Sequence, residues 1–207
     1  MLTTSRLPAT MEHQVPNRPT HIFEELLGAA RGTAAIVMGD RGAASYFDFS
    51  PRGLAGSFIA FLVANVVNAY LPALPGSPDD GLPVGKVLLV AAVLQAMQFA
   101  FSAIVLRQLA RLDGFVPYMA AHNWAAFFIT VILSILTVIG LPITFVFAVL
   151  AILALVIEVN IARLIVTLRF WQIVMLLIAQ AVGGCIGLLV MIAVLPLPAG
   201  ALGLPSG

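Results

Sequence analysis

The stretch ITFVFAVLAILALVIEVNIARL, residues 143–164, decides the fold of this chain. Its first fifteen residues carry no charge, and as a helix the stretch is long enough to cross about 30 Å of hydrocarbon. No glycine or proline occurs from Ile143 to Val182, and one helix of that length would reach about 60 Å, twice that thickness. We therefore expect a turn between Arg163 and Arg169 that separates two spans. A single long helix that projects from the membrane is the alternative.

The composition places most of the chain in a membrane. Hydrophobic residues make up 61% of the 207 residues and charged residues only 9%, whereas a soluble domain is about one quarter charged. Residues 1–53 hold ten charges, and the other 154 residues hold nine. This pattern argues against a soluble enzyme. The net charge of +1 argues against a nucleic-acid binder.

Four further apolar segments have the length of a membrane span. They cover residues 54–71, 87–106, 118–139 and 170–195. Ser50 and Pro51 are suited to the cap and first turn of the first of them. We therefore predict an all-α fold, a polytopic membrane helix bundle with five transmembrane helices in residues 54–195.

An amphipathic segment, residues 21–53, precedes the first span. Between His21 and Met38, apolar residues recur at three- and four-residue steps, and Glu24, Glu25, Gly28, Arg31 and Gly32 take the opposite side. Internal charges favour a helix that lies on the membrane surface. It packs on its own bundle or docks a partner, and both readings remain open. Residues 1–20 and 196–207 are predicted to be a disordered tail and a flexible external tail.

Basic residues predict the orientation. If the N-terminus is inside, nine arginines face the cytoplasm and only Lys86 faces outward. The first twenty residues contain no apolar stretch of signal-peptide length, so the first span is expected to target the chain to the membrane. We expect a multi-pass protein of a bacterial inner membrane, with a cytoplasmic N-terminus and an external C-terminus.

Polar residues inside the spans are the candidate sites, because each is costly in a membrane unless it is paired. Asn65 and Asn68 share one face of the first span, and Gln95 and Gln98 share one face of the second. These mid-membrane pairs could hydrogen-bond to each other across a helix interface. They are then packing contacts worth about 1 kcal/mol or less each.

A second polar group lies nearer the predicted cytoplasmic side. It consists of His122, Asn123, Glu158, Asn160 and Arg163. Glu158 is the one acid inside a predicted span, and its basic partner is expected to be Arg107, Arg111 or His122. A carboxylate beside a titratable histidine could accept a proton or bind a ligand. An ion pair that fixes helix assembly is the structural alternative, and an acid within a span is still a functional hypothesis.

Ala179, Gly183 and Gly187 form a small-residue step on the last span, which lets helices approach closely within the chain or in a homodimer. The sequence has no P-loop, HExxH, Cys/His cluster or G-x-S-x-G pattern, so we expect no enzyme activity and no cofactor or metal. His122 is the one histidine within the predicted spans, which excludes a bis-histidine haem site there.

Two short elements carry a resemblance to known proteins. GDRGAASYFDFSPRGLAGSF (39–58) and RLDGFVPYMAAHNW (111–124) resemble a set of uncharacterised bacterial inner-membrane proteins with five spans. The residues that match this bacterial set are Phe47, Asp48, Ser50, Gly53, Tyr118, Asn123 and Trp124. The layout of the spans also resembles the Yip1-like family, whose eukaryotic members imply membrane trafficking and binding of small GTPases.

These patterns predict a non-enzymatic integral membrane protein with an organising, trafficking-like or accessory-subunit role. Its expected partners are the lipid bilayer and other membrane proteins or a second copy, with no nucleic acid. The rival hypothesis is a small transporter or proton-coupled permease that uses Glu158 and His122. A water-filled cavity at Glu158 would favour the transporter, and a packed bundle with an exposed apolar groove would favour the organiser.

Overall fold

A computed structural model describes residues 22–70 and 83–195. These residues form helices and turns, with no strand among them. Between the helices lie two short 3₁₀ turns, η1 (Ala43–Tyr46) and η3 (Leu112–Gly114), and one π-helical turn, η4 (Ile161–Ile165). The helices are α1 (Ile22–Met38), α2 (Pro51–Tyr70), α3 (Val84–Gln108), α4 (Phe115–Val138), α5 (Ile143–Asn160) and α6 (Phe170–Val194). The predicted tails, 1–20 and 196–207, lie outside the described residues.

Five helices of the described chain, α2 to α6, are long and apolar enough to cross a membrane. The predicted all-α bundle with five spans is confirmed, and five such helices indicate a multi-pass membrane protein. The reading with one long projecting helix is wrong, because α5 passes into η4 and the chain turns before Phe170. The turn is stabilised where the Arg169 backbone N–H donates to Gln172 Oε1 at 2.8 Å, which caps α6.

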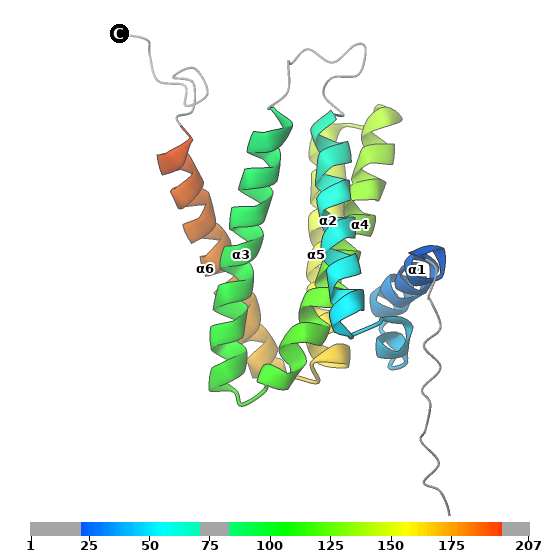
Figure 1. Cartoon of the computed structure of the whole chain (residues 1–207), viewed down its shortest axis with the longest axis vertical. Helices are drawn as coiled ribbons and strands as arrows, with labels where there is room; N and C mark the ends of the chain where they lie inside the picture. The colour runs from blue at the N-terminus through cyan, green and yellow to red at the C-terminus, as the bar shows by residue number, and fades with distance from the viewer. Residues whose placement is uncertain (1–21, 71–82, 196–207) are drawn as a thin grey trace, which may run out of the picture.

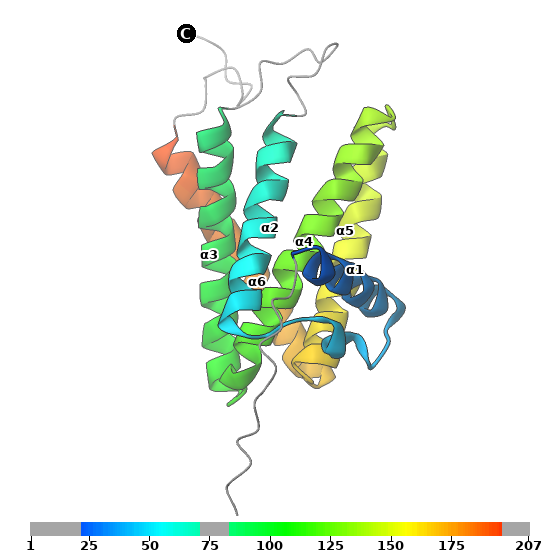
Figure 2. The same cartoon turned by 45° about the vertical axis from the view of Figure 1, so that its right-hand side comes forward.

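The five spans run alternately up and down, and α1 lies against the side of the bundle, in the half nearer the end at which α2 begins (Figures 1 and 2). This end is called the α1 end below. α3 packs along α6, α2 packs along α4, and α5 lies beside α4. Because α3, α5 and the α1 segment all finish at the α1 end, the loops there bring together residues distant in sequence.

The small residues of α6 face α3. Ala179, Gly183 and Gly187 are buried, and a Cβ on Gly183 would lie 2.8 Å from the Met97 carbonyl oxygen. A Cβ on Gly187 would lie 3.2 Å from the Cα of Leu94. The small-residue step therefore serves close helix packing within the chain, one of the two readings of its sequence.

The orientation of α1 differs from the sequence prediction. Its bundle-facing side is made mostly of small residues such as Ala29 and Ala35, together with the fully buried Ile36, while the large side chains Phe23 and Met38 are each 76% exposed. Gly32, expected on the polar side, packs so closely under Phe47 that a Cβ would lie 2.6 Å from the ring. The apolar periodicity correctly predicted the helix but not the face that contacts the bundle. Small residues such as Ala29 and Gly32 let α1 approach the bundle more closely than large apolar residues would, so the smaller face packs inward.

The entry to α2 explains the sequence element FDFSPRG. Asp48 Oδ1 accepts the Ser50 N–H at 2.9 Å, and Asp48 Oδ2 accepts the Ser50 hydroxyl at 2.9 Å. Ser50 Oγ in turn accepts the Gly53 N–H at 3.2 Å, which is the predicted N-cap. A Cβ on Gly53 would lie 2.1 Å from the Asp48 carbonyl oxygen, so this position requires glycine. The element thus forms a helix cap.

Candidate functional site

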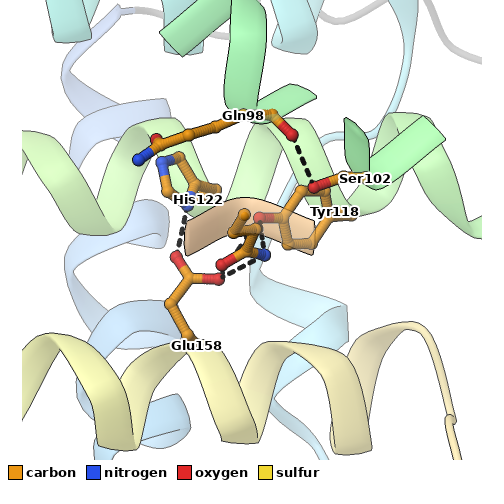
Figure 3. A network of polar contacts seen from close by, with 6 residues as sticks. Gln98, Ser102, Tyr118, His122 and Glu158 are labelled. Carbon is orange, nitrogen blue, oxygen red and sulfur yellow. Dashed lines mark hydrogen bonds and ion pairs between the residues drawn. The ribbon is translucent and has the colours of Figure 1, made fainter. Parts of the chain in front are cut away.

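The Glu158 carboxylate lies at the centre of a polar network inside the bundle (Figure 3). Its Oε1 hydrogen-bonds to His122 Nδ1, and its Oε2 accepts the Tyr118 hydroxyl at 3.3 Å. Gln180 Nε2 donates to the same Oε2 at 3.4 Å and to the Tyr118 hydroxyl oxygen at 2.5 Å. We call Tyr118, His122, Glu158 and Gln180 the Glu158 network. It joins α4, α5 and α6.

Helix geometry and one aromatic ring position these groups. Tyr118 and His122 are four residues apart on α4, so their side chains lie on one face of the helix. The Phe99 ring of α3 packs edge-on against both, with centroid distances of 6.0 Å to Tyr118 and 5.4 Å to His122. The side chains of His122 and Glu158 are only 17% and 16% exposed. His122 and Glu158 are therefore largely buried. The helix α3 covers one side of the network, with Gln98 and Ser102 near His122 and Tyr118 (Figure 3).

The Glu158 network can carry one chemical event, the movement of a proton. His122 and Glu158 form an ion pair when the imidazole is protonated and a neutral hydrogen-bonded pair when the proton moves to the carboxylate. Both carboxylate oxygens already have donors, which is how a buried charge is stabilised. Within the described ranges, no three His, Cys, Asp or Glu side chains are placed to hold a metal ion.

The structure separates the five residues predicted as one cluster. Asn123 Nδ2 donates to Ser57 Oγ at 3.1 Å on α2, and Asn160 Nδ2 donates to the Ile36 carbonyl oxygen of α1 at 2.8 Å. Arg163 lines a cavity at the α1 end. Glu158 and Asn160 point in different directions because two residues turn a helix by about 200°. Only His122 and Glu158 of the five form one network.

The basic partner of Glu158 is therefore His122, one of the three candidates. Arg111 is instead a loop clamp. Its Nη2 donates to the Val166 carbonyl oxygen at 2.5 Å and to Thr167 Oγ1 at 2.6 Å, and its Nη1 donates to the Thr167 carbonyl oxygen at 3.3 Å. These bonds hold the chain between η4 and α6.

The mid-membrane amides do not bond to each other in the described part of the chain. Asn65 Nδ2 donates to the Phe61 carbonyl oxygen of its own helix at 2.8 Å. Gln95 is buried, and its Nε2 has no partner there. Asn68 and Gln98 are half-buried. The expected hydrogen bonds between the two pairs are thus replaced by a bond within α2.

Two members of the Glu158 network were missed by sequence reasoning. Tyr118 carried a signal, because it lies four residues before His122 and so shares its helix face. Gln180 carried a weaker one as a polar residue in an apolar span. No sequence pattern gave the rotation of α6 that turns Gln180 toward α4.

A second candidate site is an apolar groove of about 230 Å³ between α1, α2 and α4, which we call the α1 groove. The carboxylate of Glu25 lies beside it, and Glu25 Oε1 is buried with no hydrogen-bond partner among the described residues. Burial raises the pKa of Glu25 above its ordinary value of 4.5, the Asp48 carboxylate adds to the rise, and Arg52 opposes it. The groove is lined by Glu25, Leu26, Gly56, Ile59, Ala60, Val63, Trp124 and Phe127.

The chain was compared with protein-family models, with curated proteins and with solved structures, and none of the three comparisons finds a match.

Proposed function

We propose that this chain is a non-enzymatic membrane protein that organises or assists other membrane components, and that the α1 groove binds a helix of the partner. The observation that carries this proposal is the α1 groove itself, an apolar surface with an unpartnered carboxylate oxygen. The partner helix would carry a lysine, an arginine or an amide donor near the α1 end.

The apolar part of the groove is suited to another helix. Ile59 and Val63 are 63% and 49% exposed, and they are four residues apart on one face of α2. Gly56 lies one turn before Ile59, and the Glu25 carboxylate packs over it, since a Cβ on Gly56 would lie 2.4 Å from Glu25 Oε1. Trp124 and Phe127 of α4 form the opposite side of the groove. Helix docking in membranes relies on such close packing because there is no hydrophobic gain from leaving lipid.

The carboxylate supplies the specificity. A buried polar atom without a partner is costly, and a donor from a bound helix would remove that cost. Lipid chains could fill the apolar part of the groove but offer no donor to Glu25 Oε1. A partner with a cationic or amide group satisfies both parts.

The proposal includes the location. The arginines at the α1 end, which include Arg107, Arg111, Arg163 and Arg169, support a cytoplasmic placement of that end in a bacterial inner membrane. The N-terminus is then cytoplasmic and the C-terminus external. The resemblance to five-span bacterial proteins and to the Yip1-like layout agrees with this proposal.

The test is purification in mild detergent with quantification of proteins that co-elute. Val63→Trp fills the groove at an exposed position, and Leu62→Trp places the same large side chain one residue away on the same helix, where Leu62 is 43% exposed. We expect a stoichiometric partner with the natural sequence and with Leu62→Trp, and its loss with Val63→Trp. Elution of all three as the same lone species would contradict the proposal.

A second candidate function is proton-coupled transport, favoured by the contact between His122 and Glu158 inside the spans. The three described cavities are lined by other residues, so the transporter has weaker support than the organiser. Reconstitution into liposomes with a pH-sensitive dye in the lumen tests it. A proton flux that Glu158→Gln abolishes would establish transport, and equal fluxes from protein-containing and empty liposomes would exclude it.

A further inference from the structure

A cavity of about 590 Å³ at the α1 end is lined by two arginines and a threonine, away from both candidate sites. The lining residues are Gly39, Arg41, Arg163, Leu164 and Thr167. We infer that this cavity binds the phosphate group of an anionic phospholipid. Two guanidinium groups are the donors that recognise a phosphate through paired N–H bonds.

The charges of this cavity are unbalanced. Among the described residues, neither Arg41 nor Arg163 has a carboxylate within ion-pair distance. The nearest acid in the sequence, Asp40, uses Oδ1 to accept the Gly42 N–H at 2.8 Å. Arg111, a third guanidinium at this end, is committed to the Val166 and Thr167 oxygens. Two unpaired positive charges therefore line one cavity.

The walls of the cavity are fixed by contacts distant in sequence. Asn160 Nδ2 bonds the Ile36 carbonyl oxygen at 2.8 Å, which ties the end of α1 to the end of α5. Gly39 follows with φ +73°, a left-handed conformation that favours glycine, and a Cβ there would lie 3.3 Å from Arg163 Nη2. Thr167 has φ +58° and is held by Arg111. The site is thus formed before a ligand arrives.

The position and size favour a lipid over free phosphate. Phe170 and Trp171, next along the chain, are 71% and 75% exposed, as expected for aromatic side chains at the headgroup level. Leu164 provides an apolar wall where a glycerol backbone would lie. A volume of about 590 Å³ exceeds what a single phosphate ion occupies and suits a headgroup. Basic pockets between membrane helices are a recurrent form of lipid headgroup site.

The experiment measures lipid retention by native mass spectrometry. The protein is reconstituted in a mixture of phosphatidylglycerol and phosphatidylcholine, extracted in mild detergent and compared with the double variant Arg41→Gln/Arg163→Gln. Arg31→Gln/Arg107→Gln is the matched control, because it removes the same charge at exposed positions outside the cavity. We expect one retained phosphatidylglycerol with the natural sequence and the control, and at least about tenfold weaker retention with the cavity variant.

A second arm separates the two sources of phosphate. Inorganic phosphate is titrated against the protein carrying phosphatidylglycerol, and we expect no displacement of the lipid at millimolar phosphate. Displacement would show that the cavity selects free phosphate and would overturn the lipid assignment. Equal lipid retention by both double variants would overturn the site itself. The variant Arg41→Lys/Arg163→Lys keeps both charges and controls for misfolding. Its retention of phosphatidylglycerol should lie between that of Arg41→Gln/Arg163→Gln and that of Arg31→Gln/Arg107→Gln.

Discussion

Two glutamates of this chain occupy opposite environments. Glu158 lies within the spans and has partners on both oxygens, drawn from α4 and α6. Glu25 lies on α1 beside a groove, and its Oε1 is buried with no partner among the described residues. The fold itself supplies hydrogen-bond partners for Glu158, whereas it leaves Glu25 Oε1 free to accept a hydrogen bond from a bound partner. We infer that Glu158 stabilises the bundle and that Glu25 recognises a partner.

The largest effect is expected from breaking the satisfied site. Glu158→Ala leaves His122, Tyr118 and Gln180 without their common acceptor inside the spans. Removal of one member of a buried pair costs about 3 kcal/mol or more. The measurement is the unfolding free energy in detergent, from titration with a denaturing detergent. His122→Ala should have a similar effect.

The double variant His122→Ala/Glu158→Ala is the control for this prediction. If the pair acts as a unit, the double variant should lose clearly less stability than the sum of the two single losses. Additive losses would mean that the two residues act independently. Full stability of Glu158→Ala would contradict a structural role and direct attention to proton transfer.

The sequence predicted the fold well and the sites only in part. The charge-free run 143–157 and the helix-breaking residues predicted five spans, because the thickness of the bilayer fixes the length of a helix that crosses it. The contact of His122 with Glu158 was among the predicted pairings. Asn123 and Asn160 lie apart from this contact because of how α4 and α5 are rotated about their axes. The sequence does not predict that rotation, because the different faces of each helix are similarly apolar. The burial of Gly32 depends on a tertiary contact with Phe47.

An intermediate effect is expected where α6, which carries Gln180 of the Glu158 network, packs closely on α3. Gly183→Ala would place a Cβ 2.8 Å from the Met97 carbonyl oxygen, and backbone atoms cannot move aside cheaply. We expect a loss of about 1–3 kcal/mol in unfolding free energy. Thermal unfolding followed by size-exclusion chromatography measures it.

The adjacent Gly184→Ala is the matched control. Its Cβ would meet only the flexible side-chain end of Gln98, at 3.1 Å. Alanine also favours a helix over glycine by about 0.5–1 kcal/mol, so we expect Gly184→Ala to be neutral or stabilising. A similar loss for both variants would argue against the close approach of α6 to α3.

The smallest effect is expected at Glu25, and it depends on pH. Because the folded-state pKa of Glu25 is raised, the folded protein binds more protons than the unfolded chain between 4.5 and that raised value. The free energy of unfolding should therefore rise as the pH falls through the raised pKa of Glu25. Below pH 4.5 Glu25 is protonated in both states, and its contribution no longer changes with pH. Glu25→Gln removes this contribution, so its melting temperature should change less between about pH 7 and pH 4.5 than that of the natural sequence. Parallel melting curves would show that Glu25 is not responsible.

The most direct test of partner recognition is photo-crosslinking in intact membranes. A photo-reactive amino acid replaces Val63 in the α1 groove or Leu62 beside it, and crosslinked products are separated by mass. We predict a discrete protein adduct from position 63, its loss when Glu25→Leu removes the acceptor oxygens, and no such adduct from position 62. The same products from both positions, or an adduct from position 63 that persists with Glu25→Leu, would contradict recognition of a partner by Glu25 in the groove.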